Sequence, residues 1–276
     1  MRGASRASPR RVMEENTFGQ KLLAEVVGTG FLVFIGVGSV PATLMLLGNH
    51  QFTMAELGVI SFAFALVVIA MVYTIGHISG CHINPAVTVS LALTGKFPWK
   101  DVPAYVGAQA LGAVLGSLAI LATLGMDAKD LGLGVAAFNP DTVGYGRAIF
   151  AEAIGTGILV FTVFGVIDRR APAGFAGIVI GFVVFAAIIV VGPVTGASIN
   201  PARTFGPMLI LQLFGGDVTW SQIPAYLIGE FAGAALAAWL YIALARTRTV
   251  EHVPDFPLKE ATTEHHVTVS ADGAGA

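Results

Sequence analysis

Long apolar stretches separated by short polar segments make up most of the chain between residues 20 and 246. A helix needs about 20 apolar residues to cross a bilayer, and six stretches are that long. They run approximately over 20–47, 54–75, 101–124, 146–167, 174–192 and 222–246. Two more, 84–94 and 200–212, are shorter. At about 1.5 Å per residue these reach only half of a core about 30 Å thick, so the pattern predicts six spanning helices and two half-helices.

The composition supports a membrane protein. Hydrophobic residues make up 55% of the chain and charged residues 12%, whereas soluble domains carry roughly 25% charged residues. We therefore expect an all-α protein embedded in a lipid bilayer, with a channel-type domain over 18–246 and no nucleic-acid partner. The polar tails, 1–17 and 247–276, are predicted to be disordered. Histidines in the second tail, His252, His265 and His266, fit a solvated segment better than a metal site.

Lysine and arginine predict the orientation, since they concentrate in cytoplasmic loops. Twelve of the fifteen basic residues fall in segments that an even number of spans places on one side: Arg2, Arg6, Arg10, Arg11, Lys21, Lys96, Lys100, Arg169, Arg170, Arg246, Arg248 and Lys259. Both termini are therefore expected to be cytoplasmic, in a multi-pass protein of the plasma membrane. No cleavable signal is apparent, because the polar, basic start leads into a stretch of spanning length. Cys81 is the only cysteine, so no internal disulfide can form.

The membrane segment is duplicated. AEVVGTGFLVF at 24–34 matches AEAIGTGILVF at 151–161, and PAYVGAQALGAVLG at 103–116 matches PAYLIGEFAGAALA at 224–237. Each copy, about 18–124 and 145–246, has the order span, span, half-helix, span. Three spans are an odd number, so the second copy enters the membrane from the opposite side. The sequence thus predicts an inverted repeat with its special sites near the midplane.

Each half-helix begins with the tripeptide Asn-Pro-Ala, in the matching contexts GHISGCHINPAVT (76–88) and GPVTGASINPART (192–204). Asparagine is a preferred N-cap and proline a preferred first helical residue, so each tripeptide predicts a helix start. A helix that begins within the membrane exposes free N–H groups and a positive dipole end. Such an end is stable there only when it is buried in protein or lines a polar cavity.

In these motifs the chain resembles the aquaporin and glycerol-facilitator family, the major intrinsic proteins, over about 20–246. SGCHINPAVT, the DRRAPAGFAGI turn and NPARTFGP look most like the archaeal aquaporin M-like type. The resemblance implies six tilted helices plus two reentrant half-helices, one pore per chain and a homotetramer. It also implies a passive channel for water and other small uncharged solutes, with no cofactor and no passage for protons or ions.

The resemblance and the repeat together predict the pore residues. Asn84 and Asn200 would both donate to one permeating oxygen at the centre, with backbone carbonyls on either side. Arg203 would be the cation of the selectivity filter, held by backbone acceptors, while buried glutamates would hold the loops, Glu25 with His82 and Glu152 with the 196–199 backbone. The expected motif residues are Asn84, Pro85, Ala86, Asn200, Pro201 and Ala202; the filter is Phe64, Ile188, Ala197 and Arg203; the carbonyls belong to Gly80, Cys81, His82, Ile83, Gly196, Ala197, Ser198 and Ile199.

This filter departs from both main subfamilies. Strict water channels usually place histidine where this chain has Ile188, and glycerol facilitators place glycine there together with two large aromatics. Phe64 is the one aromatic available here, and Thr204 stands where glycerol facilitators typically carry aspartate. A filter wider and more apolar than a water-only one is expected. A glycerol-preferring facilitator remains the alternative within the family.

Two other classes of protein fit the sequence less well. A secondary transporter also uses inverted repeats and broken helices, and Glu25 and Glu152 could serve such a protein as proton carriers, although a structural role is preferred. An enzyme is disfavoured, because no nucleophile, base and orienting group converge in the sequence. A metal site is also disfavoured, since His82 has no partner at zinc-like spacing. His77 is interpreted as an exposed loop histidine rather than a pH sensor.

Overall fold

The computed structural model describes residues 15–247, and all of its described helices lie in a compact unit that ends at Ala245. The predicted disorder of residues 1–14 and 248–276 falls outside the described residues. Between Glu15 and Ala245 the chain is helical throughout its regular segments, with no strand. The predicted all-α class is therefore confirmed.

Six spans cross this unit, each long and apolar enough for a bilayer: Phe18–Leu47, Met54–Ser79, Trp99–Leu124, Tyr145–Val166, Ala176–Thr195 and Trp220–Ala245. The main helices of the last five are α3 (Met54–Ser79), α5 (Val102–Leu124), α7 (Tyr145–Val166), α8 (Ala176–Thr195) and α10 (Ile223–Ala245). Short 3-10 turns precede two of them, η2 (Trp99–Asp101) before α5 and η4 (Trp220–Gln222) before α10. A small helix, α6 (Asp127–Asp130), and a 3-10 turn, η3 (Gly132–Gly134), lie in the loop between the repeats.

The first span is not one regular helix. It consists of α1 (Phe18–Phe31), a π-helical segment η1 (Leu32–Val37) and α2 (Ser39–Leu47). Isolated π turns are uncommon and often mark functional places in helices. Gly36 lies in η1, and a side chain there would collide with the ring of Phe64 on α3. The widened turn thus brings a residue without a side chain against the aromatic predicted to line the filter.

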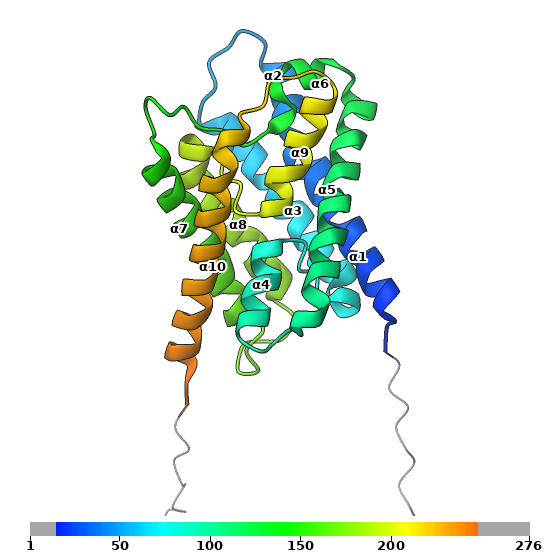
Figure 1. The fold of residues 1–276 in the computed structure, drawn as a ribbon, viewed down its shortest axis with the longest axis vertical. Coiled ribbons are helices and arrows are strands. Elements are labelled where there is room, and N and C mark those ends of the chain that lie inside the picture. Colours follow the sequence, from blue (N-terminus) through cyan, green and yellow to red (C-terminus); the bar gives the residue numbers. More distant parts are fainter. Residues whose placement is uncertain (1–14, 248–276) are drawn as a thin grey trace, which may run out of the picture. The chain divides into compact units, whose positions relative to one another are not determined.

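The two half-helices lie between spans of both repeats. These are α4 (Pro85–Leu93) and α9 (Pro201–Leu213), and each begins at the proline of its Asn-Pro-Ala motif. Figure 1 shows α9 above α4, with α10 on one flank and α5 on the other. The second-repeat α9 packs mainly on α5 of the first repeat, and the first-repeat α4 packs on α10 of the second as well as on α5. The half-helices thus tie the repeats together.

Small residues allow the spans to approach closely. Helix α10 packs along α7 and α5 along α1, while α3 packs along α8 across the repeats. A Cβ at Gly229 of α10 would lie 2.6 Å from the carbonyl oxygen of Ile149 on α7. Contacts of this kind are typical of membrane helix pairs, where small residues permit backbone approach.

Candidate functional site: a pore at the meeting point of two half-helices

Two cavities lie within the helical unit and share part of their lining. The first, of about 510 Å³, is lined by the N-terminal residues of both half-helices and includes the exposed side chains of Tyr73 and Lys96. The second, of about 470 Å³, includes the exposed Phe52 and the partly buried Val135 in its lining. Phe64, Ile188 and Arg203 line both cavities. The passage is therefore divided by these three residues, which are predicted filter positions.

Asn84 and Asn200 cap the half-helices and bond across the centre of the first cavity. Each side-chain oxygen accepts from its own helix, Asn84 Oδ1 from the Ala86 N–H at 2.9 Å and Asn200 Oδ1 from the Ala202 N–H at 3.0 Å. Each side-chain nitrogen donates to the opposite loop, Asn84 to the Ile199 carbonyl and Asn200 to the Ile83 carbonyl, both at 2.8 Å. An amide NH₂ has two hydrogens. One N–H of each asparagine therefore remains for a molecule in the cavity.

The loops before the half-helices have unusual backbone conformations. Cys81 and Ile83 have φ of 49° and 43°, and their repeat mates Ala197 and Ile199 both have φ of 46°. Left-handed conformations are rare for non-glycine residues and costly for β-branched ones. The Ile83 and Ile199 carbonyls accept hydrogen bonds from the side-chain amides of Asn200 and Asn84. Of the eight residues predicted to supply carbonyls, seven line the first cavity, and Gly196 lines the second.

Two buried glutamates hold these loops in place. Glu25 accepts from the backbone N–H of His82 at 2.9 Å and of Ile83 at 2.7 Å. Glu152 accepts from Ser198 N–H at 3.0 Å and Ile199 N–H at 2.7 Å. Neither glutamate has solvent exposure. The carboxylates thus accept hydrogen bonds from loop N–H groups that have no partner in a helix or strand. These charge-assisted hydrogen bonds offset the free-energy cost of the unusual loop conformation.

Glycines make room for the loop isoleucines. A Cβ at Gly28 of α1 would lie 2.8 Å from Ile83 Cγ2, and a Cβ at Gly155 of α7 would lie 2.8 Å from Ile199 Cγ2. Gly28 and Gly155 occupy matching places in the repeat text AEVVGTG and AEAIGTG. The same residue type at both places shows that the repeat extends to the packing behind each loop.

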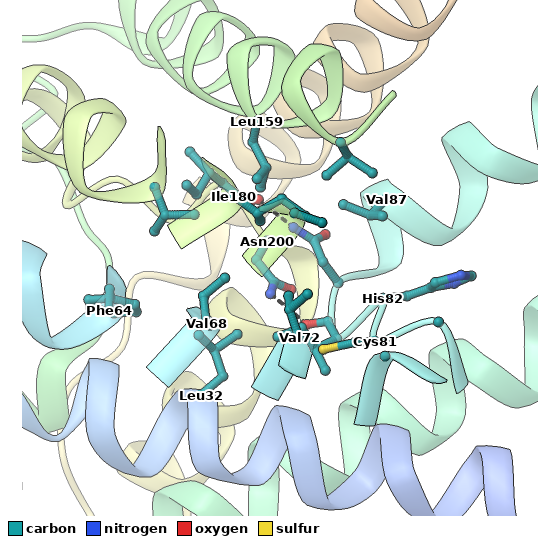
Figure 2. Close-up of a pocket in the computed structure, with 18 of the residues that line it drawn as sticks. Leu32, Phe64, Val68, Val72, Cys81, His82, Val87, Leu159, Ile180 and Asn200 are labelled. Carbon is teal, nitrogen blue, oxygen red and sulfur yellow. Dashed lines mark hydrogen bonds between the residues drawn. The ribbon is translucent and has the colours of Figure 1, made fainter. Parts of the chain in front are cut away.

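The expected partner of Glu25, His82, contributes its backbone rather than its ring. The ring nitrogen Nδ1 lies 3.1 Å from Thr88 Oγ1, and the ring packs on Phe97 and Tyr105 with centroids 4.8 and 5.1 Å apart. Figure 2 shows this ring pointing away from Asn200. Cys81, free and buried, lines the first cavity. No group of three His, Cys, Asp or Glu residues suited to a metal ion occurs among residues 15–247.

Arg203 differs from its predicted setting. Its side chain is 3% exposed, and in the described part of the chain its Nε and Nη1 atoms have no hydrogen-bond partner, so the expected backbone acceptors are not found. Instead the guanidinium carbon lies 5.7 Å from the centroid of the Phe64 ring. A cation at this distance from an aromatic face is attracted by the ring quadrupole. The aromatic and the cation of the constriction therefore support each other.

The loop after α7 closes one side of the first cavity's mouth. Arg170 donates to Asp168 through Nε at 2.9 Å and Nη2 at 2.7 Å, and Nη2 also donates to the Ala245 carbonyl at 3.1 Å. The hydrogen bonds from Arg170 hold the pKa of Asp168 below its usual range. Across the mouth, the Tyr73 hydroxyl donates to the Gly174 carbonyl at 2.8 Å. The loop is thus fixed at both ends.

The sequence interpretation missed two polar residues behind the loops. Gln109 on α5 donates to Glu25 Oε2 and to Thr88 Oγ1, both at 2.9 Å. Glu230 on α10 accepts from the backbone N–H of Asn200 at 2.9 Å. Both have no solvent exposure. They occupy matching positions in the repeated PAY segments. An alignment of the two copies would therefore have identified both as polar residues at equivalent places in apolar helices.

A family model described as Major intrinsic protein matches residues 12–241 of this chain. The chain belongs to the major intrinsic protein family. The resemblance first drawn from the doubled Asn-Pro-Ala motif is confirmed by a match that covers both repeats.

Relatives of this major intrinsic protein include two archaeal proteins. It is 47% identical over 244 residues to the protein named Probable aquaporin AqpM of Archaeoglobus fulgidus, covering 83% of this chain and 98% of that one. It is 43% identical over 236 residues to Aquaporin AqpM of Methanothermobacter thermautotrophicus, covering 80% and 96%. The likeness to the archaeal M-like type is thereby confirmed.

A solved structure supports the same fold for this family member. The aquaglyceroporin from Plasmodium falciparum superposes with a TM-score of 0.72 at 24% identity, covering 82% of this chain and 96% of that one. This chain therefore shares the overall fold of that solved structure.

Proposed function

We propose that this major intrinsic protein is a passive transmembrane channel for water and other small uncharged solutes that excludes protons and ions, and that it is not an enzyme. The observation that carries the proposal is the pair of capping asparagines at the cavity centre. Each has one N–H bonded to the opposite loop at 2.8 Å and one left for a permeating molecule.

Proton exclusion follows from the direction of these donors. A water oxygen that accepts from both Asn84 and Asn200 points its own hydrogens away along the passage, so it cannot accept a proton from a neighbour. The N-terminal ends of α4 and α9 both carry a positive partial charge towards the same point. Arg203 adds a full positive charge at the constriction. Hydronium and metal cations are thus opposed at two places along the pore.

The residues proposed for selectivity are Phe64, Ile188, Ala197 and Arg203. Ala197 is small and 2% exposed, and Ile188 is an aliphatic side chain where a hydrogen-bond donor would favour water alone. Such a filter accepts solutes with some apolar surface. Passage of small neutral solutes besides water is therefore part of the proposal.

The protein is proposed to work as a homotetramer in the plasma membrane with both termini cytoplasmic. The start of α1 and the end of α10 lie at the same end of the helical unit in Figure 1, which supports a common side for both. The basic residues near these ends favour the cytoplasmic side. Each chain contains both halves of its own passage, so each subunit would carry one pore.

Stopped-flow light scattering on proteoliposomes tests the function. We expect water flux with a weak temperature dependence, no dependence on proton or sodium gradients, and proton flux no higher than in empty liposomes. Asn200→Ala should lose most of the water flux, whereas Asn49→Ala, at an exposed turn, should retain it. Proton flux well above the empty-liposome level in the wild type, or solute uptake driven by an ion gradient, would refute the channel.

A glycerol-preferring facilitator is the second candidate, favoured by the absence of a donor at Ile188. The same assay separates the two candidates, because a facilitator passes glycerol at a rate comparable to water. The inverted-repeat transporter is distinguished by gradient dependence. Both outcomes are read from the same vesicles.

A further inference from the structure

The supports behind the two pore loops share one hydrogen-bonding pattern around a buried glutamate, but an amide in the first repeat is replaced by a carboxyl group in the second. In each repeat a hydroxyl and two backbone N–H groups bind one glutamate, and a tyrosine hydroxyl donates to the carbonyl of the last residue of the long helix before the loop. These residues are Ser79, His82, Ile83 and Tyr105 around Glu25, and Thr195, Ser198, Ile199 and Tyr226 around Glu152. The two repeats differ at Gln109 and at Glu230, which occupies the matching position of the second repeat.

In the first repeat this position is an amide that acts as a donor. Gln109 Nε2 donates to Glu25 Oε2 and to Thr88 Oγ1, each at 2.9 Å. An amide is neutral and supplies two N–H groups. The first repeat thus contains one buried carboxylate, Glu25, and a neutral residue that binds it.

In the second repeat a carboxyl group takes this place. Glu230 Oε1 accepts two hydrogen bonds, from the backbone N–H of Asn200 at 2.9 Å and from the Thr204 hydroxyl at 3.2 Å. Its Oε2 is buried and has no hydrogen-bond partner within residues 15–247. An ionised carboxylate left with an unbonded oxygen in such a place is strongly disfavoured.

The surrounding charges also disfavour a second anion. Glu152, on the packed helix α7, already binds three donors and faces the same cluster. Arg203 on α9 is the one buried lysine or arginine among residues 15–247, and its Nε and Nη1 atoms form no hydrogen bond to Glu230 or to any other described group. Tyr226 on α10 donates to the Thr195 carbonyl, and α4, which also packs on α10, carries no charged residue. The negative charge of one carboxylate balances the positive charge of the Arg203 guanidinium. A second carboxylate would leave a net negative charge in this buried cluster.

We propose that Glu230 is an uncharged carboxylic acid that positions the second pore asparagine, as a neutral replacement for the amide found in the first repeat. Its carbonyl oxygen accepts from the Asn200 N–H and thereby fixes the start of α9. The Asn200 side chain lines the first cavity from this point and donates to the Ile83 carbonyl. Glu230 lines neither cavity, so its role is that of a positioning residue. Its effect on flux rests on the proposed channel function, whereas its protonation state does not.

Infrared spectroscopy tests the protonation state directly. Purified full-length protein in lipid at neutral pH should show a carboxylic-acid C=O stretch that shifts in D₂O and on ¹³C-glutamate labelling. Glu230→Gln should remove this band, whereas Asp141→Asn, at an exposed loop, should leave it unchanged. Absence of the band from labelled wild-type protein, which requires no variant to fold, overturns the proposal. A band that persists in folded Glu230→Gln also overturns it.

Permeability tests the positioning role. Glu230→Leu leaves the Asn200 N–H buried without an acceptor and should lower water flux about tenfold per folded tetramer, a change of about 1.4 kcal/mol. Glu230→Gln offers a carbonyl oxygen and should recover most of that loss. Equal flux in the leucine and glutamine variants, both folded, refutes the positioning role. If the wild type itself passes no water, the proposed function fails while the infrared result still stands.

Discussion

Replacing Ile188 tests whether the two cavities are joined where we propose. Ile188 lines both cavities, so its side chain borders the constriction from either side. Histidine at this position adds a ring that can donate to water and that narrows the passage. Glycine removes the whole side chain and widens it. The first change should reduce the flux of glycerol-sized solutes far more than water flux, and the second should do the opposite.

The size of the effect follows from the apolar contact that is changed. Discrimination in an apolar pocket amounts to about 1–3 kcal/mol per methylene-scale change. Since about 1.4 kcal/mol corresponds to a factor of ten, the solute-to-water ratio should move by roughly tenfold to a hundredfold. Phe64 and Arg203 hold each other at 5.7 Å, so they are not expected to move into the space and cancel the change.

The assay is stopped-flow measurement of water and glycerol flux in the same proteoliposomes, normalised to folded protein. Glycine also weakens a helix by about 1 kcal/mol, so Val190→Gly is the matched control: it lies on the same helix with 72% exposure, away from the cavities. It should leave the ratio unchanged. Ratios within about twofold of wild type in both folded Ile188 variants, against the tenfold expected, would show that Ile188 does not set the width of the pore.

Three further results are expected. External, membrane-impermeant thiol reagents should inhibit weakly, because Cys81 is buried on the first-repeat loop and Ala197 occupies the matching second-repeat place; a rapid external block abolished by Cys81→Ser would contradict the proposed orientation. Gly233→Ala should lower thermal stability by about 1–3 kcal/mol, because its Cβ would meet the α7 backbone, whereas Gly58→Ala, with open space, should not; equal melting temperatures would refute this packing. Asp168→Asn should speed tryptic cleavage after Arg170. Because the pKa of Asp168 is lowered, wild-type protection should persist from neutral to mildly acidic pH and disappear only below the ordinary aspartate range; protection lost near neutral pH would contradict it.

The long elements could be predicted from the sequence because their causes are local. Apolar length fixed the spans to within a few residues, and the Asn-Pro pair placed the starts of α4 and α9 at Pro85 and Pro201. The π-helical turn at Leu32–Val37 could not be predicted in this way. It brings Gly36 against the Phe64 ring on another helix, and hydropathy contains no information on which helix will be the neighbour.

Some features of the site could likewise be predicted from the sequence and others could not. The resemblance and the repeat together predicted filter and carbonyl positions that line the two cavities. They did not predict that each asparagine amide bonds to the opposite loop, because this depends on how two inverted copies meet. The setting of Arg203 was also wrong in detail: the expected backbone acceptors are replaced by the Phe64 ring. Glu230 was overlooked because a single glutamate in an apolar helix is informative only when it is compared with Gln109, its mate.

The hydrogen bonds that each asparagine side chain makes to the opposite loop have a consequence for how the protein is synthesised and folds. Asn84 needs the Ile199 carbonyl, and Asn200 needs the Ile83 carbonyl, so neither half of the chain can satisfy the groups at its own centre. During synthesis the first half enters the bilayer before the second exists, and its polar loop must stay hydrated or shielded until then. Closure of the centre is therefore a late event that joins the two halves. A chain that stops after the first repeat would leave those groups unpaired at membrane depth, which gives quality-control machinery a feature by which to recognise it as unfinished.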